Sequence, residues 1–190
     1  MKACNFKEGK LSAVRSLQHI LETPRLIVRQ YTMNDADDFF ALNGDQEVMR
    51  YIRPSKTRKE CDAFLAQNIN FYNTHSHLGR WAAYEKTTKE FIGSFAIIPI
   101  DEETNNVQIG YALMRSVWGK GFATELVQYG KVFFFKMHDA DILYALTEEP
   151  NIASQKVLLK CGFTENGNLI SGTRNLLKFL IHRKDFLNTQ

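Results

Sequence analysis

The feature that most constrains the fold is a strand–helix–strand succession in the second half of the chain. Residues 107–114 form a β-rich run, residues 122–137 repeat apolar side chains at helical spacing, and residues 141–147 form another β-rich run. Two parallel strands joined by a helix cross over in the right-handed sense in nearly all known sheets. The succession therefore predicts a parallel strand pair with a helix covering one face of the sheet.

The other local patterns extend this unit into a larger mixed sheet. Thr57 followed by Glu60 forms a capping box, and Gly44 and Gly162 each end a helical pattern. We therefore predict an α/β fold with a mixed central sheet of about seven strands flanked by about four helices. The predicted strands are residues 25–31, 80–85, 91–98, 107–114, 141–147, 163–167 and 175–181, and the predicted helices are residues 34–44, 57–72, 122–137 and 151–161.

The apolar content of the chain supports one domain of ordinary size. With 190 residues and 44% hydrophobic side chains, folding would bury about 70% of the surface that the unfolded chain exposes. We assign residues 21–187 to this single domain and residues 1–20 to an N-terminal extension. Apolar side chains recur at helical spacing there, so the extension is either a short amphipathic helix or a disordered leader. These side chains are Leu11, Val14, Leu17 and Leu21.

Charge and cysteine content argue against several classes of protein. The formal net charge of +3 is too small for a nucleic-acid-binding surface, and the apolar runs are far shorter than the ~20 residues of a membrane span. Residues 1–10 have no apolar run, so no secretion signal is expected. The widely spaced Cys4, Cys61 and Cys161 favour reduced thiols over disulfides or a metal site. We expect a cytoplasmic monomer or homodimer without a bound metal.

A two-glycine loop joins the first strand of the strand–helix–strand unit to its helix. The backbone N–H groups and partial positive charge at a helix start form an anion site. Gly119 and Gly121 let the backbone approach a ligand without obstruction by a Cβ atom, and Lys120 adds a mobile cation. The loop is thus predicted to hold phosphate groups. A turn that serves only packing is the alternative, because two-glycine motifs also arise by chance.

A second segment strengthens the prediction of a ligand site. Asn151 stands at the start of a predicted helix, and Ser154 lies one turn later on the same face. Both side chains can form hydrogen bonds with an amide-rich ligand that lies along the helix start. Taken singly, Asn151 is an ordinary N-cap residue and Ser154 an ordinary surface serine. Together with the glycine loop, they favour a binding site.

These segments resemble the GNAT superfamily of acetyl-CoA-dependent N-acetyltransferases, and within it the branch that includes the ribosomal-protein-alanine N-acetyltransferases. The resemblance covers about residues 21–187. It rests on LETPRLIVRQYTMNDADDFFAL, DQEVMRYI, IGYAL, WGKGFATE and NIASQKVLLKCGF, which occur in the order and spacing of that branch. The superfamily's pyrophosphate motif is Gln/Arg-x-x-Gly-x-Gly/Ala. Gly121 and Ala123 match it, whereas Trp118 replaces its first residue, as is usual in the branch.

The resemblance implies a fold detail and a set of binding residues. It implies that the sheet splays between its fourth and fifth predicted strands, and that the pantetheine arm of acetyl-CoA enters there. It also implies that the backbone N–H of Leu113 donates to the thioester carbonyl. The cofactor-binding residues implied are Tyr111, Ala112, Leu113, Trp118, Gly119, Lys120, Gly121, Phe122, Ala123, Thr124, Asn151 and Ser154.

The reaction implied is acetyl transfer from acetyl-CoA to a primary amine by direct attack in a ternary complex. The first expectation for the acceptor is the N-terminal α-amine of a protein. A small-molecule amine, such as a polyamine, an amino acid or an aminoglycoside, is the alternative. A non-catalytic acyl-CoA sensor and a module that binds ATP or NAD are the rivals from other classes.

The groups that move protons depart from the family pattern. Leu158 stands where many members have a tyrosine that protonates the thiolate, so Ser154 is the predicted catalytic donor. Gln108 stands where relatives often have a glutamate base. The choice of base stays open among Glu102, Glu103, Glu148 and Glu149, and an acetyl-carrying Cys161 is less favoured than a buried thiol. Trp81, Gln108 and Tyr111 are the predicted acceptor-binding side chains.

Overall fold

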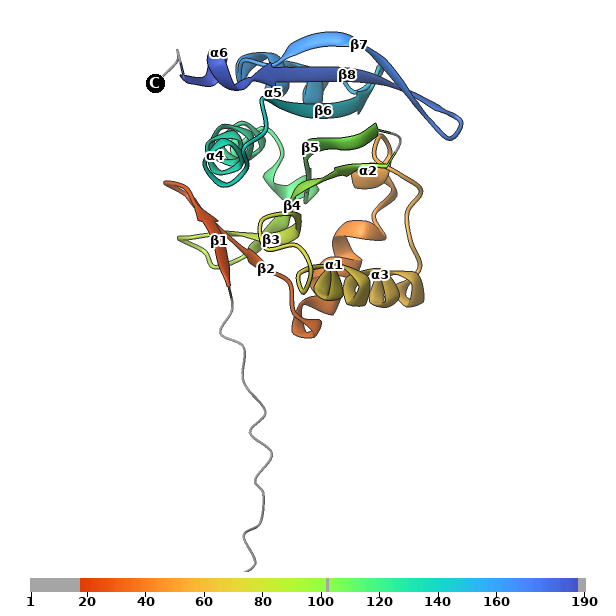
Figure 1. Ribbon diagram of the computed structural model, residues 1–190. Helices are drawn as coiled ribbons and strands as arrows, with labels where there is room; N and C mark the ends of the chain where they lie inside the picture. The colour runs from red at the N-terminus through yellow and green to blue at the C-terminus, as the bar shows by residue number, and fades with distance from the viewer. Residues whose placement is uncertain (1–17, 102, 188–190) are drawn as a thin grey trace, which may run out of the picture.

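The structure is a computed structural model that describes residues 18–101 and 103–187 (Figure 1). Its centre is one eight-stranded sheet with the strand order β1-β2-β3-β4-β5-β6-β8-β7. The predicted mixed α/β fold is confirmed. The strands are β1 (His19–Glu22), β2 (Leu26–Gln30), β3 (Gly79–Glu85), β4 (Phe91–Ile100), β5 (Glu103–Leu113), β6 (Ile142–Glu148), β7 (Thr164–Ser171) and β8 (Arg174–His182).

Six α-helices accompany the sheet in the described part of the chain. The four predicted helices are present, although α1 begins later than residue 34, because a short 3₁₀ helix, Met33–Asp35, precedes it. The prediction missed β1, α2 and α6, which have only four or five residues and therefore too little periodicity to be recognised. The helices are α1 (Ala36–Asn43), α2 (Gln46–Met49), α3 (Arg58–Phe71), α4 (Phe122–Met137), α5 (Ile152–Lys160) and α6 (Arg183–Leu187).

The N-terminal expectation is only partly within the described residues. Leu11, Val14 and Leu17 of the possible helix lie outside them. Leu21 is part of β1, which begins at His19 and so includes the last two residues that we assigned to the extension. Among the described residues, no helix is long and apolar enough to cross a membrane.

The sheet splays between β5 and β6, as predicted. These strands are parallel neighbours that share a single bridge, Gln108 with Tyr144. The other neighbouring strands pair in the antiparallel sense, and β6 and β8 stay paired along their full length. The sheet is therefore divided into a β1–β5 part and a β6–β8 part that diverge beyond this bridge.

The two faces of the sheet are covered by different helices (Figure 1). Along β3, Trp81 and Ala83 join the apolar cluster under α4, whereas Ala82 joins the cluster under α1 and α3. This alternation is the two-residue period of a strand. Gly130 brings α4 close to the sheet, because a Cβ atom there would lie 2.3 Å from Cζ of Phe95. This close packing holds α4 against the sheet.

Candidate active site

A cavity of about 750 Å³ lies where β5 and β6 diverge. On the α4 side of the sheet, its walls are the β5–α4 loop and the first turns of α4 and α5. On the other side, which we call the acceptor side, its walls are α2, the segment that follows α2, and parts of β3 and β4. The cavity therefore runs through the splay and is bordered by residues from both faces of the sheet.

The glycine loop lines this cavity with exposed backbone. Gly121 is the N-cap of α4 and has φ of 81°, and Gly119 has φ of 76°. Both angles are in the left-handed region that favours glycine. A Cβ atom at Gly119 would meet nothing within 4 Å, and one at Gly121 would meet only Nη2 of Arg25. The N–H groups of the first turn of α4 have no acceptor within their own helix, so they can bind an anion.

Two side chains hold this loop in place. The indole Nε1 of Trp118 donates to the carbonyl of Leu113 at 2.8 Å. Nη1 of Arg25 donates to the carbonyl of Lys120 at 2.9 Å, and the Arg25 guanidinium lies 4.4 Å from the centre of the Phe122 ring. Lys120 itself does not line the cavity, unlike the other residues predicted from this loop. The sequence analysis missed Arg25 as a neighbour of this loop, because it is 95 residues from Lys120 in the chain.

The start of α5 brings together three predicted residues. Asn151 caps α5, and its Oδ1 accepts from the N–H of Ser154 at 3.2 Å. The Tyr111 hydroxyl donates to Oγ of Ser154 at 3.5 Å. Burial raises the pKa of Tyr111, so its phenol keeps the proton at neutral pH. The structure thus places a phenol from β5 next to Ser154, one turn from the buried Leu158.

The backbone of β5 directs amides toward the cavity. The N–H of Met114 donates to the carbonyl of Ile92, beside β4, at 2.9 Å. Successive N–H groups of a strand point to opposite edges, so the amides of Tyr111 and Leu113 point away from β4, toward β6. Both residues line the cavity, as does Ala112.

Comparisons with known proteins show the family to which the chain belongs. Residues 25–164 match the family model of the acetyltransferase (GNAT) domain. The chain belongs to the GNAT acetyltransferases. It is 30% identical over 152 residues to the uncharacterised N-acetyltransferase YoaA of Bacillus subtilis, covering 79% of this chain and 85% of the relative. GNAT enzymes use acetyl-CoA, and this chain is an acetyl-CoA-dependent N-acetyltransferase that transfers the acetyl group to an amine.

Two solved structures show the GNAT fold with coenzyme A. The complex of RimL, a ribosomal L7/L12 α-N-protein acetyltransferase, has a TM-score of 0.73 at 15% identity and covers 87% of this chain and 98% of that one. The spermidine N-acetyltransferase of Vibrio cholerae, in complex with CoA and spermine, has a TM-score of 0.67 at 22% identity, with 86% and 98% covered. At these identities the likeness shows the fold.

In this GNAT domain, Trp81 is not a cavity residue, which corrects the prediction that it binds the acceptor. Its side chain is fully buried and stacks on Phe95, with 5.9 Å between ring centres. Successive side chains of a strand point to opposite faces of the sheet. The sequence pattern does not tell whether an aromatic side chain on one face packs in the core or lines a binding site. Gln108 and Tyr111, the other predicted acceptor-side residues, do line the cavity.

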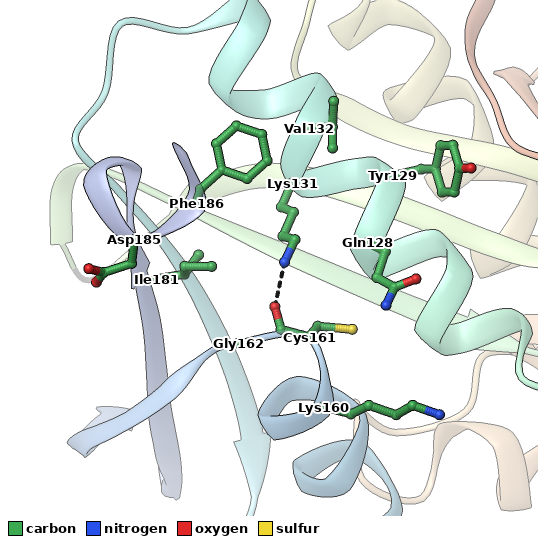
Figure 2. Close-up of a pocket in the computed structure, with 10 residues that line it drawn as sticks. All are labelled: Gln128, Tyr129, Lys131, Val132, Lys160, Cys161, Gly162, Ile181, Asp185 and Phe186. Carbon is green, nitrogen blue, oxygen red and sulfur yellow. Dashed lines mark hydrogen bonds between the residues drawn. The ribbon is translucent and has the colours of Figure 1, made fainter. Parts of the chain in front are cut away.

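Cys161 of the GNAT domain borders a different pocket. Figure 2 shows this pocket, of about 470 Å³, between the later part of α4, the end of α5, and α6. Nζ of Lys131 donates to the Cys161 carbonyl at 2.6 Å. The Cys161 thiol is buried, which raises its pKa, and its Sγ contacts the carbonyl of Thr124 at 3.6 Å. A protonated, buried thiol outside the main cavity fits a packing role better than that of an acetyl carrier.

Two of the four carboxylates considered as bases are engaged with cations. Glu148 pairs with Nε of Arg174 at 2.7 Å, and Glu103 accepts from Nζ of Lys178 at 2.7 Å. Glu149 is exposed and does not line the cavity, and Glu102 lies outside the described residues. Among the described residues, the carboxylates that line the cavity are Glu47 and Asp101, and neither was considered in the sequence analysis.

The acceptor side contains arginines that no motif indicated. Arg53 follows α2, and Arg80 lies in β3; both line the cavity. Arg174 of β8 donates to the carbonyl of Tyr51 at 3.0 Å and so fastens the segment after α2 to the far part of the sheet. These residues are far apart in the chain and meet only through the tertiary fold. Their spacing in the sequence therefore could not predict that they share a cavity.

Proposed function

We propose that this GNAT enzyme acetylates a primary amine by direct attack in a ternary complex, with a protein N-terminal α-amine as the leading acceptor. The observation that carries the proposal is the cavity through the splay, which is bordered by the glycine loop on one side and by α2 and β3 on the other. Donor and acceptor can therefore meet from opposite faces of the sheet. RimL acts on a protein α-amine, which favours the leading acceptor, and the spermidine enzyme represents the alternative of a small-molecule amine.

The residues around the splay fit a CoA donor. Gly119 and Gly121 leave backbone room for a pyrophosphate at the start of α4. Thr147 and Ala145 of β6 form part of the opposite wall. The proposed donor-binding groups are the N–H groups and side chains of residues 111–113, Trp118, Gly119, residues 121–124, Asn151 and Ser154.

Acetyl-CoA supplies the acetyl group as a thioester, whose carbonyl oxygen gains negative charge when the amine attacks. The Leu113 N–H, which points away from β4, is the proposed donor to that oxygen. The amine must be neutral to attack, and the thiolate that departs needs a proton or a hydrogen bond. The Tyr111 phenol and the Ser154 hydroxyl are the proposed donors for the thiolate.

Replacing Tyr111 with phenylalanine should lower kcat by about a hundredfold or more, because general-acid assistance typically contributes ~10²–10⁴-fold. Ser154→Ala should lower kcat by about tenfold or less, as expected for one neutral hydrogen bond. Because both side chains are also proposed to bind the donor, the dissociation constant of acetyl-CoA should rise by at most about tenfold in either variant, the range for one neutral hydrogen bond. Tyr144→Phe is the matched control, because Tyr144 lies in β6 and does not line the cavity. If Tyr111→Phe had the same kcat as the wild type, the Tyr111 phenol would not be the proton donor.

The acidic limb of the turnover profile should follow the ionisation of the acceptor, not that of an enzyme group. Turnover should rise with pH until the amine is neutral, near pH ~8 for an α-amine and ~10.4 for a lysine ε-amine. Tyr111, whose pKa is raised by burial, should stay protonated across the α-amine limb. The measurement is kcat against pH at saturating acetyl-CoA with both acceptors. A limb that is the same for both, and that disappears in Asp101→Asn, would show an enzyme base instead.

Release of CoA from acetyl-CoA in the presence of an amine panel tests the proposed function. The panel should contain peptides with free N-termini, amino acids, an aminoglycoside and spermidine. Amine-dependent release is expected, whereas a sensor would bind acetyl-CoA without releasing CoA. Thermal shifts with acetyl-CoA, ATP and NAD test the remaining rival, since only acetyl-CoA is expected to raise the melting temperature.

A further inference from the structure

Two arginines on the acceptor side of the cavity have no anionic partner. The side chains of Arg53 and Arg80 both line the cavity. Among the described residues, no carboxylate oxygen lies within 4.0 Å of either guanidinium. Partly buried arginines in folded proteins are normally paired with a carboxylate or phosphate, since a desolvated charge costs free energy. The pair is therefore a feature that the apo fold does not explain.

The surroundings of the two guanidinium groups satisfy them only in part. Nη2 of Arg53 donates to Oδ1 of Asn43 at 2.6 Å, but its Nε is buried without a hydrogen-bond partner. Both groups lie over the ring of Phe64 in α3, at 4.9 Å for Arg53 and 5.3 Å for Arg80. Both guanidinium groups therefore lie close to one aromatic ring, and both side chains also line the cavity. The Nε is enclosed by protein atoms, so the charge of the two guanidinium groups, rather than this nitrogen, is what the cavity offers to an anionic ligand.

Positive charge exceeds negative charge around the guanidinium groups of Arg53 and Arg80. Burial lowers the pKa of Arg53 to about 10, and the charge of Arg80 adds to this effect; burial also lowers the pKa of Arg80. The other arginines of the cavity are already paired, Arg50 with Glu47 and Arg174 with Glu148. Asp101, which is exposed, is the remaining carboxylate that faces the pair.

From this geometry we infer that the acceptor is a primary amine that also carries a carboxylate, and that Arg53 and Arg80 bind this carboxylate. The inference rests on the proposed N-acetyltransfer and names the chemical class of its acceptor. A planar carboxylate suits the guanidinium fork and would neutralise the two positive charges that line the cavity. A polyamine would instead bring further positive charge to two desolvated cations.

The carboxylate can come from a free amino acid or from an acidic residue at the start of a peptide. Wild-type enzyme should therefore be assayed with two acid–amide pairs. The first is β-alanine against β-alaninamide, and the second is a glutamate-first against a glutamine-first peptide with an amidated C-terminus. Each kcat/KM is expressed per neutral amine, because acid and amide differ in amine pKa. We expect the acid to exceed the amide by at least about tenfold in one pair, which identifies the source, and to exceed spermidine too.

Variants then connect the preference to the two arginines. Arg53→Gln/Arg80→Gln should bring the acid-to-amide ratio close to one while leaving kcat/KM for the amide within about threefold. Arg80→Lys, which keeps the charge, should retain part of the preference. Arg58→Gln is the matched control, because Arg58 is on α3 and pairs with Asp37 and Asp62 outside the cavity. Its ratio should equal that of the wild type.

The outcomes separate this inference from the proposed function. Acetylation of amides or spermidine as efficient as that of the acids would overturn the inference and leave the function intact. No acetylation of any amine would overturn the function itself. An acid preference that persists in the double variant, or an acetyl-CoA dissociation constant raised tenfold there, would show that the arginines serve another ligand group. If the double variant fails to fold, the wild-type acid-to-amide ratio and Arg80→Lys still decide.

Discussion

Gly121→Val is expected to raise the dissociation constant of acetyl-CoA by at least tenfold. Gly121 caps α4 with φ of 81° and lines the cavity, so a branched side chain there has two effects. It places two methyl groups where the backbone should meet the pyrophosphate, and it strains the left-handed backbone that aims the first N–H groups of α4. Isothermal titration calorimetry with acetyl-CoA measures the change.

The control for Gly121→Val must carry the same strain without touching the cavity. Gly167 fulfils this condition, because its φ is 72°, a Cβ atom there meets nothing within 4 Å, and it lies in β7 away from the cavity. Gly167→Val should lose a similar amount of folding stability but bind acetyl-CoA as the wild type does. Equal affinities in the two folded variants would contradict the proposed pyrophosphate site.

Asp35→Ala is expected to lower the free energy of unfolding by about 3–5 kcal/mol, the range for breaking a buried ion pair by removing one partner. The buried Asp35 carboxylate accepts from both terminal nitrogens of Arg29, at 2.9 and 2.7 Å, and from the Tyr84 hydroxyl at 2.8 Å. The N–H of Thr32 donates to it at 2.7 Å. Removing the carboxylate would leave the partly buried Arg29 charge without its anionic partner, and would take this acceptor from the Thr32 N–H and the Tyr84 hydroxyl.

The control for Asp35→Ala is Asp37→Ala. Asp37 is exposed and pairs with Arg58 at 2.6 Å, so its removal should cost at most about 1 kcal/mol. Urea denaturation of the three proteins at neutral pH gives the two differences. If Asp35→Ala cost no more than Asp37→Ala, the buried network would contribute nothing to stability.

The stability difference for Asp35 should also depend on pH. Burial disfavours its charge, but the hydrogen bonds from Arg29, Thr32 and Tyr84 outweigh burial and lower the pKa of Asp35 from 3.8 to about 2. A carboxyl whose pKa is depressed in the folded state stabilises the fold fully above its unfolded pKa. The advantage of the wild type over Asp35→Ala should therefore be constant above about pH 5 and shrink as the pH falls from about 4 toward 2.

The parts of the fold that the sequence predicted are those set by local patterns. The predicted helix of residues 122–137 coincides with α4, because its apolar spacing is long and its start is marked by Gly121. The capping box of Thr57 and Glu60 likewise marks the start of α3. By contrast, β1 has four residues and is defined by its pairing with β2, which is a tertiary contact.

The candidate site divides in the same way. Its α4 side comes from two continuous segments, and the residues predicted there, Gly119, Gly121, Asn151 and Ser154, line the cavity; that they bind a ligand stays a prediction. Its acceptor side is assembled from separate elements, and Arg53 and Arg80, 27 residues apart in the chain, come together at the Phe64 ring of α3. The contact of Tyr111 with Ser154 spans 43 residues and depends on how β5 lies against α5. No spacing rule reports such contacts.

The most direct test of the account follows the acetyl group itself. The enzyme is incubated with acetyl-CoA that carries an isotope label in the acetyl group and with a primary amine from the acceptor panel, and tandem mass spectrometry locates the label. We predict that the label appears on the amine nitrogen of the acceptor, and that none is found on Cys161 when the acceptor is omitted. Tight binding of acetyl-CoA with no labelled amine across the panel, or a labelled Cys161 that passes its label to the acceptor, would contradict direct transfer by this enzyme.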